Sequence, residues 1–103
     1  MSDWVRVASL EEIEEGSLLG VEAEGEHIVL ARVDGKVYAL EDQCSHQEYP
    51  LSDGELEGER LECIYHGAVF DVCTGDAKQL PAIKPVKTYE VDLRDDDVYV
   101  DVE

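Results

Sequence analysis

The sequence predicts an all-β domain, a small antiparallel sandwich or barrel with a loop-rich insert in its middle. Short β-rich runs alternate with turn signals toward both ends of the chain. The stretch from about residue 42 to residue 85 differs, since it holds all three prolines and four of the eight glycines. That stretch also contains two pairs that each combine one cysteine with one histidine.

The first part of the chain predicts four strands and one helical turn. Ser9 and Glu12 match a capping box, so we expect a helical turn from Ser9 through Glu15 that ends at Gly16. Asp34-Gly35 lies between two β-rich runs and is a strong hairpin signal. The expected strands are Val5–Ala8, Leu18–Ala23, His27–Val33 and Lys36–Leu40.

The rest of the chain predicts two short strands, Arg60–Cys63 and Ala68–Val72, and a final pair, Tyr89–Leu93 and Val98–Val102. With 103 residues the chain forms one domain, because two would each be too small to bury a useful core. We expect a base formed by residues 1–41 and 86–103 and an inserted subdomain at about 42–85.

The charge balance excludes some partners. The chain has 8 basic and 26 acidic residues and a net charge of −18, so nucleic acid would be repelled and anionic membranes are disfavoured. The acidity either steers the chain onto a basic partner, reflects an adaptation of the whole proteome, or is only a solvated surface. No apolar run is long enough for a membrane span and the start shows no secretory signal, so we expect a cytoplasmic protein.

The candidate ligands are Cys44-x-His46 and Cys63-x-x-His66, with sixteen residues between the pairs. An odd cysteine count without a secretory signal argues against a disulfide framework and for metal or redox use. Two cysteines and two histidines can bind zinc or an iron–sulfur centre. The order Cys, His, Cys, His suits a centre in which the cysteines bind one metal ion and the histidines another. A structural zinc site and four unliganded residues remain open at this point.

Cys44-Ser45-His46 and Cys63-Ile64-Tyr65-His66-Gly67 resemble the Rieske motif, Cys-x-His followed by Cys-x-x-His-Gly. The stretches LSDGELEG, FDVCTGDA and LPAIKPVKTYEV resemble the small Rieske ferredoxins of bacterial aromatic-ring-hydroxylating dioxygenase systems. The resemblance implies a Rieske (ISP domain) fold, with an antiparallel β base and a small cluster-binding subdomain. It also implies one [2Fe-2S] cluster per chain, with Cys44, His46, Cys63 and His66 as ligands.

The resemblance implies a soluble, monomeric one-electron carrier. It would take electrons from an NAD(P)H-dependent flavin reductase and pass them to a terminal oxygenase with its own Rieske centre. Substrate chemistry would occur in the partner, so the chain is not expected to be an enzyme or to hold catalytic residues. The alternatives are the small subunit of an assimilatory nitrite reductase, a zinc-stapled interaction module, and a ferredoxin that serves some other oxygenase.

Departures from related proteins predict a low reduction potential. Rieske proteins of respiratory complexes carry two further cysteines, where this chain has Tyr49 and Tyr65. They also carry a serine and a tyrosine that donate to cluster sulfurs, where this chain has Ala68 and Phe70. With fewer donors the reduced state is less stabilised, so we expect a potential at the low end of the Rieske range, on the order of −150 mV.

Four other residues of the insert carry weaker expectations. In the family, residues at the positions of Leu51, Leu80 and Pro81 shield the cluster, although ordinary core packing explains them nearly as well. Cys73 lies outside the motif at the end of a strand. We expect it to be a free thiol with no role; the alternative is a redox-sensitive or metal-scavenging thiol.

Overall fold

The computed structural model describes residues 4–42, 51–63, 69–79 and 86–102, which form antiparallel strands and two short 3-10 helices. The elements are β1 (Trp4–Ser9), η1 (Leu10–Glu12), β2 (Leu18–Ala23), β3 (Glu26–Val33), β4 (Lys36–Glu41), η2 (Leu51–Asp53), β5 (Glu55–Glu57), β6 (Arg60–Glu62), β7 (Val69–Asp71), β8 (Ala77–Gln79), β9 (Thr88–Tyr89), β10 (Val91–Arg94) and β11 (Asp97–Asp101). The all-β prediction is confirmed. Within the described ranges, no helix has the length and apolar character needed to cross a membrane.

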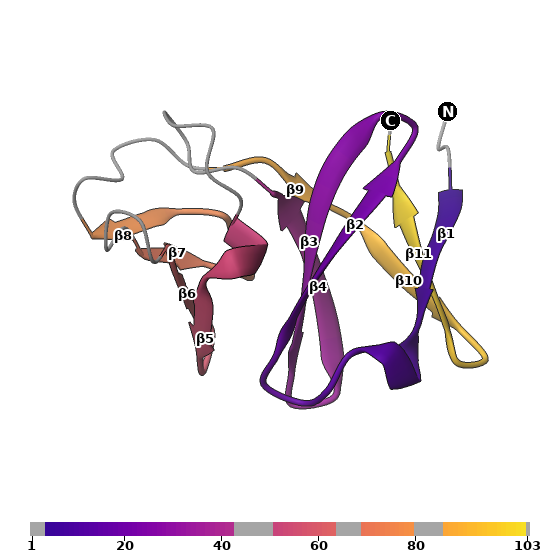
Figure 1. The fold of residues 1–103 in the computed structure, drawn as a ribbon, viewed down its shortest axis with the longest axis horizontal. Helices are drawn as coiled ribbons and strands as arrows, with labels where there is room; N and C mark the ends of the chain where they lie inside the picture. Colours follow the sequence, from indigo (N-terminus) through magenta and orange to yellow (C-terminus); the bar gives the residue numbers. More distant parts are fainter. Residues whose placement is uncertain (1–3, 43–50, 64–68, 80–85, 103) are drawn as a thin grey trace.

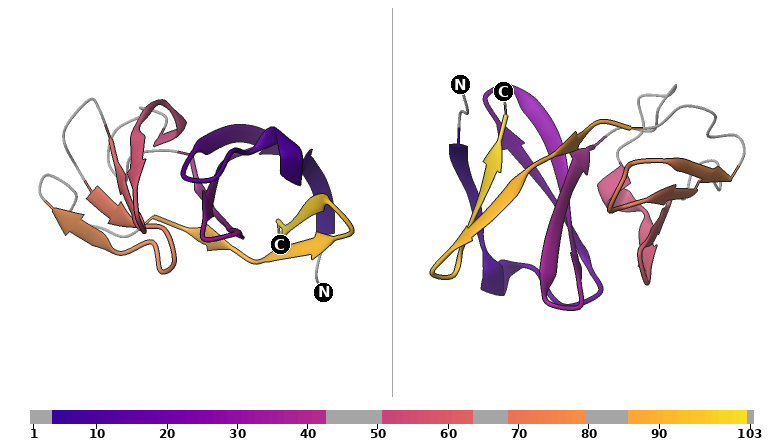
Figure 2. Two further views of the ribbon diagram at one scale, coloured as in Figure 1. Left: turned by 90° about the horizontal axis from the view of Figure 1, so that it is seen from below. Right: turned by 180° about the vertical axis from the view of Figure 1, so that it is seen from behind.

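The strands form three antiparallel sheets (Figure 1). One sheet has the order β1-β11-β10 and a second has the order β2-β3-β4-β9. We call these two sheets the base. The third sheet, β5-β6-β7-β8, stands to one side of the base in both views of Figure 2. Strand β9 is the element of the base that directly follows the third sheet along the chain (Figure 1).

Two tight hairpins set the register of the second sheet. Asp34 and Gly35 have φ angles of 52° and 78°, so both lie in the left-handed region that a two-residue hairpin turn needs. The predicted hairpin is therefore confirmed. Glu24-Gly25 repeats this geometry one strand earlier, with φ angles of 52° and 80°. The β2 strand has the predicted bounds, and β3 and β4 differ from prediction by one residue each.

The helical turn predicted through Glu15 is shorter than expected. The helix covers only Leu10–Glu12, and Ile13 already has an extended backbone with φ of −116° and ψ of 108°. The Glu12 carboxylate does accept the backbone N–H of Ser9, as a capping box requires (3.0 Å). Tertiary packing ends the helix, because extension places the Ile13 side chain in the core, where it is 1% exposed.

The strand predicted at Tyr89–Leu93 is two strands. β9 pairs with β4 in the second sheet, and β10 pairs with β11 in the first. Glu90 lies between them and its carbonyl accepts the N–H of Asp101 at 3.0 Å. The chain therefore passes from one sheet of the base to the other within a single run of alternating apolar and acidic residues, a transfer that local patterning does not reveal.

Strand β3 is buried on both faces. Ile28 and Leu30 point into the core of the base, together with residues such as Val98 and Val100 of β11. Val29 and Ala31 point the other way, into a second core that the third sheet helps to form. This second core contains Leu40, Leu51, Leu61, Cys63, Phe70, Val72 and Val86. The base and the third sheet are thus joined by continuous apolar packing.

Candidate metal centre

Of the four predicted ligands, Cys63 is the one within the described residues. It directly follows β6, is 0% exposed, and belongs to the core shared by β3 and the third sheet. Cys44, His46 and His66 lie outside the described residues, as do Leu80 and Pro81. The predicted strands around Cys63 are shorter than expected, Arg60–Glu62 and Val69–Asp71, and β5 and β8 were not predicted.

The register of the third sheet places described residues that adjoin the predicted Cys/His segments at one end of the sheet. Glu55 lies opposite Glu62, Glu62 opposite Val69, and Val69 opposite Gln79. Cys63 follows this row of paired residues directly, and the segment with His66 connects Cys63 to Val69. The segment with Cys44 and His46 leads into η2, which precedes β5. Among the described residues, Leu51, Cys63 and Val69, which flank the predicted Cys/His segments, therefore lie toward the same end of the sheet.

The described surroundings of Cys63 fit an iron–sulfur ligand. Its neighbours in the core are apolar, and they include Leu61 and Phe70, which lie opposite each other on β6 and β7. Two thiolates and two imidazoles form the donor set of a Rieske centre, and burial of a ligand thiolate in apolar surroundings limits solvent access. Leu51 is also 0% exposed in this core, which agrees with ordinary packing.

Gly54 allows two segments beside Cys63 to touch. A Cβ built on Gly54 would collide with the carbonyl oxygen of Glu62 and would lie 3.0 Å from that of Leu51. The Gly54 N–H donates to the Leu51 carbonyl at 2.9 Å. Only a residue without a side chain fits between η2 and the end of β6. Sequence reasoning did not single out this glycine, and its place in LSDGELEG was the available signal.

Gly75 lies in close contact with Val86, which precedes β9 in the chain. Its φ is +80°, and a Cβ there would collide with the carbonyl oxygen of Val86. The Val86 N–H donates to the Gly75 carbonyl at 2.9 Å, while the Gly75 N–H donates to that of Asp71 at 2.7 Å. The hydrogen bond from Val86 therefore holds the turn between β7 and β8 beside the part of the chain that leads into β9.

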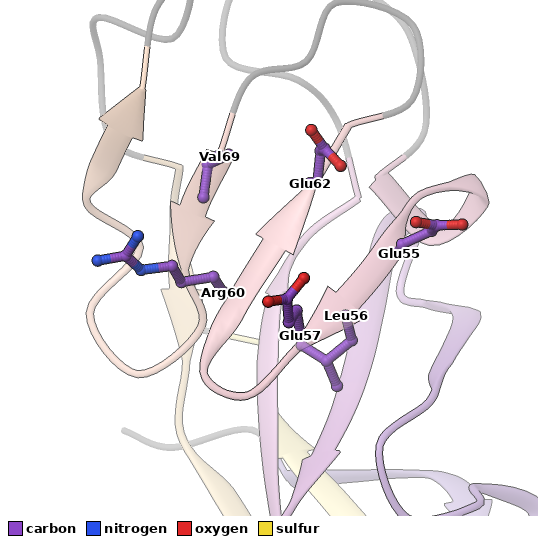
Figure 3. A pocket seen from close by; sticks show the side chains of 6 residues that line it. All are labelled: Glu55, Leu56, Glu57, Arg60, Glu62 and Val69. Atoms are coloured by element: carbon purple, nitrogen blue, oxygen red, sulfur yellow. The ribbon is translucent and has the colours of Figure 1, made fainter.

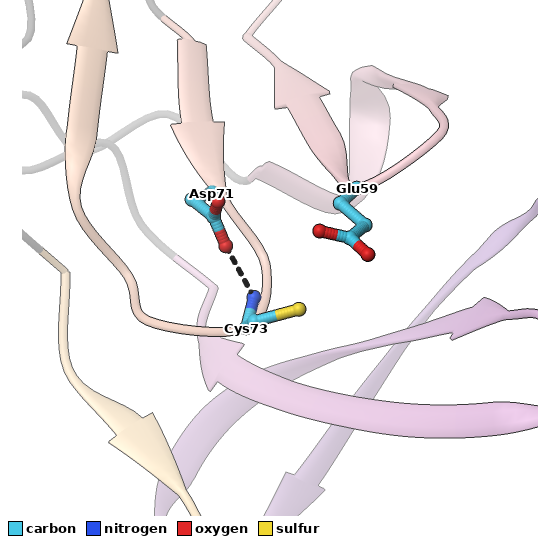
Figure 4. A group of neighbouring side chains, drawn as sticks. All are labelled: Glu59, Asp71 and Cys73. Carbon is cyan, nitrogen blue, oxygen red and sulfur yellow. Dashed lines mark hydrogen bonds between the residues drawn. The ribbon is translucent and has the colours of Figure 1, made fainter.

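The register of β6 and β7 places Cys73, two residues after β7, at the opposite end of the third sheet from Cys63. Figure 4 shows Cys73 with Glu59 and Asp71. One ligand-type atom from each of Glu59, Asp71 and Cys73 lies within 4.8 Å of the others. The Asp71 carboxylate, however, accepts the backbone N–H groups of Cys73 (2.8 Å) and Thr74 (3.2 Å), as in an ordinary turn. Partial burial, together with the charges of Glu59 and Asp71, raises the pKa of the Cys73 thiol, although a hydrogen bond with Tyr38 opposes this. A thiol with a raised pKa is poorly reactive.

The outer face of the third sheet is acidic (Figure 3). Glu55, Glu57 and Glu62 are exposed there, and Arg60 lies beside them. Together with Leu56 and Val69 they line a depression of about 280 Å³. We call Glu55, Glu57 and Glu62 the acidic face. It includes two residues of the row that leads into the ligand segments.

Comparisons with known proteins agree with this arrangement. The family model described as Rieske [2Fe-2S] domain matches residues 3–90. The ferredoxin component of the naphthalene 1,2-dioxygenase system of Pseudomonas putida is 40% identical over 99 residues, covering 96% of this chain and 95% of that protein. The ferredoxin of carbazole 1,9a-dioxygenase from Nocardioides aromaticivorans IC177 has a TM-score of 0.94 at 33% identity, over 99% of this chain and 100% of that chain. A chain in a complex of reduced oxygenase and oxidized ferredoxin in carbazole 1,9a-dioxygenase has a TM-score of 0.93 at 34% identity, covering 100% of this chain and 96% of that one.

Proposed function

The chain belongs to the family of Rieske [2Fe-2S] domains, and on that premise we propose that it carries single electrons within a multicomponent aromatic-ring dioxygenase system. One observation carries the proposal. The chain matches a dioxygenase ferredoxin component over 96% of its own length and 95% of that protein's length. The match thus extends over nearly the whole of that ferredoxin component.

We propose Cys44, His46, Cys63 and His66 as the ligands of one cluster per chain. When bound, such a cluster supplies reversible one-electron chemistry. The two neutral imidazoles replace two anionic thiolates, which favours the reduced state relative to an all-cysteine centre. The burial of Cys63 supports its role as a ligand that is shielded from solvent. The histidines are our candidates for electron entry and exit, and no residue of the chain is assigned a catalytic role.

We expect the potential to lie at the low end of the Rieske range, on the order of −150 mV. Phe70 supports this expectation, because it is 0% exposed within the apolar core and has no hydroxyl with which to stabilise a reduced sulfur. A low potential suits a carrier that receives electrons from a nicotinamide cofactor through a flavoprotein.

The proposed partners are a flavin-dependent NAD(P)H reductase and a terminal oxygenase with its own Rieske centre. The relative seen in complex with an oxygenase supports the second partner. The acidic face supports docking to basic protein surfaces, because complementary charge speeds diffusional encounter. We further propose that the chain acts as a monomer in the cytoplasm. The three-sheet arrangement supports a base of residues 1–41 and 86–103 with a subdomain at about 42–85.

The first test is electron paramagnetic resonance of the purified protein before and after dithionite, with iron and sulfide analysis of the same sample. We expect a Rieske-type signal after reduction and iron and sulfide in the proportion of one [2Fe-2S] cluster per chain. A colourless, redox-silent sample that contains zinc and resists anaerobic iron reconstitution would overturn the carrier function. Co-purification with a large sirohaem subunit would instead identify a nitrite reductase component.

A partner assay then tests the finer proposal. The reduced protein is mixed with a terminal ring-hydroxylating oxygenase in a stopped-flow instrument, and reoxidation of the carrier is followed by its visible absorbance. We expect reoxidation that depends on the oxygenase concentration. Normal reduction potential without any transfer to such oxygenases would retain the cluster and refute the dioxygenase assignment.

A further inference from the structure

Asp42 and Ser52 are joined by two short hydrogen bonds. One carboxylate oxygen of Asp42 accepts the backbone N–H of Ser52 at 2.7 Å. The other accepts the Ser52 hydroxyl, also at 2.7 Å. Both bonds are partly buried, and hydrogen bonds to an ionised acceptor are stronger than those between neutral groups. We call this pair the Asp42–Ser52 clamp.

The clamp is attached to the base on two sides. The Asp42 N–H donates to the carbonyl of His27 on β3 at 2.9 Å, which continues the pairing of β3 with β4. On the other side, Gly20 of β2 lies against the clamp. A Cβ on Gly20 would lie 2.9 Å from the Ser52 hydroxyl oxygen and 3.1 Å from an Asp42 carboxylate oxygen.

This contact explains a glycine that the strand pattern does not. Gly20 lies within β2, opposite Val29, and glycine in a strand interior weakens the strand. Such a glycine often marks a site where another part of the chain approaches closely. Here the approaching groups are the two members of the clamp.

The clamp joins the two ends of the segment between Asp42 and Ser52. Asp42 and Ser52 are ten residues apart in sequence, and the residues between them include Cys44 and His46. Fixing the two ends of a loop removes much of its conformational freedom. A ligand pair carried by such a loop loses less entropy when it binds a metal centre, and it stays closer to the centre when one bond breaks.

We propose that Asp42 is a positioning residue for the iron–sulfur centre, acting through Ser52 to hold the segment with Cys44 and His46 in place. The proposal rests on the proposed function, since it needs these two residues to be ligands. Asp42 is not one of the four proposed ligands. Its effect is on how firmly the centre is retained.

The test compares cluster release by the wild-type holoprotein and three variants, measured as iron transfer to a colorimetric chelator under anaerobic conditions. Asp42→Ala removes both bonds, and we expect release about tenfold faster. Ser52→Ala keeps the backbone bond, and we expect an intermediate rate. Asp42→Asn should restore a rate near that of wild type, because an amide can accept from the Ser52 N–H and donate to its hydroxyl. Asp92→Ala, which removes a half-exposed aspartate paired with Arg94 on β10, is the matched control and should release its cluster at the wild-type rate.

Two further measurements separate positioning from general destabilisation. Amide hydrogen exchange of the peptide that spans residues 42–52 should speed up in Asp42→Ala and not in Asp42→Asn. The electron paramagnetic resonance spectrum of the reduced protein should also broaden in Asp42→Ala. If Asp42→Ala does not fold, the test depends on Ser52→Ala. Faster cluster release and faster amide exchange at residues 42–52 in that variant would support the proposal. Unchanged release in Ser52→Ala, or release in Asp42→Asn as fast as in Asp42→Ala, would overturn it.

The outcomes also distinguish this proposal from the proposed function. A wild-type protein without a Rieske signal refutes the function, and with it the assignment of Asp42. A wild-type protein with the signal, whose release rates do not respond to Asp42→Ala, refutes the positioning role alone.

Discussion

Glu55 on β5 lies directly opposite Glu62 on β6, so two exposed carboxylates face each other across neighbouring strands. Like charges in directly opposed positions of an antiparallel pair destabilise a sheet. The adjacent pair, Glu57 opposite Arg60, has complementary charge. The first pair therefore reduces the stability of the fold at the end of the sheet from which the ligand segments lead.

Replacing one of these two glutamates with a neutral residue should have opposite effects on the stability of the fold and on docking to a partner. We expect Glu55→Gln to raise the free energy of unfolding by roughly 0.2–1 kcal/mol, measured in urea, because the repulsion is removed. The same variant should slow electron transfer to a basic partner at low salt, since long-range attraction falls. Glu90→Gln, at an exposed position in the base, is the control for net charge alone. Equal slowing by both variants would show that docking depends on overall charge and not on the acidic face.

Gly54→Ala should damage the candidate centre from a distance. The new Cβ would collide with the Glu62 carbonyl, so either η2 or the end of β6 must move. We expect a loss of roughly 2 kcal/mol or more in unfolding free energy, together with lower iron content. Thermal melting and iron analysis measure the two effects. Wild-type stability and iron content in this variant would contradict the close approach.

The histidines should set the reduction potential. His46→Cys or His66→Cys replaces a neutral ligand with an anionic one, so the potential should fall in any variant that assembles a cluster. A redox titration followed by electron paramagnetic resonance measures the shift. His27→Cys is the control, because His27 is exposed on β3 and should leave the potential unchanged. A His46 variant with an assembled cluster and the wild-type potential would show that His46 is not a ligand.

Ionisation of Tyr89 should lower the free energy of unfolding at alkaline pH. Burial first, and then the charge of Glu26 and the hydrogen bond to it, raise the pKa of Tyr89 to about 12. The folded state therefore keeps a proton that the unfolded state loses from about pH 10 upward. Stability from this group is complete below about pH 10 and is lost as the pH rises toward 12.

The measurement is the urea midpoint at pH 9 and at pH 11. We expect a decrease between them in wild type and a smaller decrease in Tyr89→Phe, which has no phenol to ionise. Absorbance of tyrosinate at 295 nm follows the ionisation directly. Identical pH dependence in both proteins would rule out Tyr89 as its source.

Cys73 should be dispensable for the centre and slow to react. Cys73→Ser should keep the wild-type iron content; a loss of iron would mean that the ligand cysteines were wrongly chosen. At pH 8, alkylation of Cys73 by iodoacetamide in the holoprotein should be slower than that of glutathione, because the pKa of the thiol is raised. Glu59→Gln removes one negative charge that raises this pKa and should accelerate alkylation.

Local sequence patterns predicted much of the base. Asp34-Gly35 predicted a hairpin because few dipeptides adopt left-handed φ at low cost, and the strand of residues 18–23 followed from β-rich composition between turns. The family resemblance likewise depended on short motifs with fixed spacing. All of these signals are local, because the residues that make up each one lie within a few positions of each other in the sequence.

The sequence alone determined the all-β class, the Asp34-Gly35 hairpin, the acidic character and the Cys/His pairs that resemble the family motif. Tertiary structure decided which core each face of β3 enters, where the run at residues 89–93 changes sheets, and why Gly20 and Gly54 have no side chain. It also placed Asp42 against Ser52. The reason is physical: strand pairing and close packing join residues far apart in the chain, and no local pattern records which distant backbone will occupy the space beside a glycine.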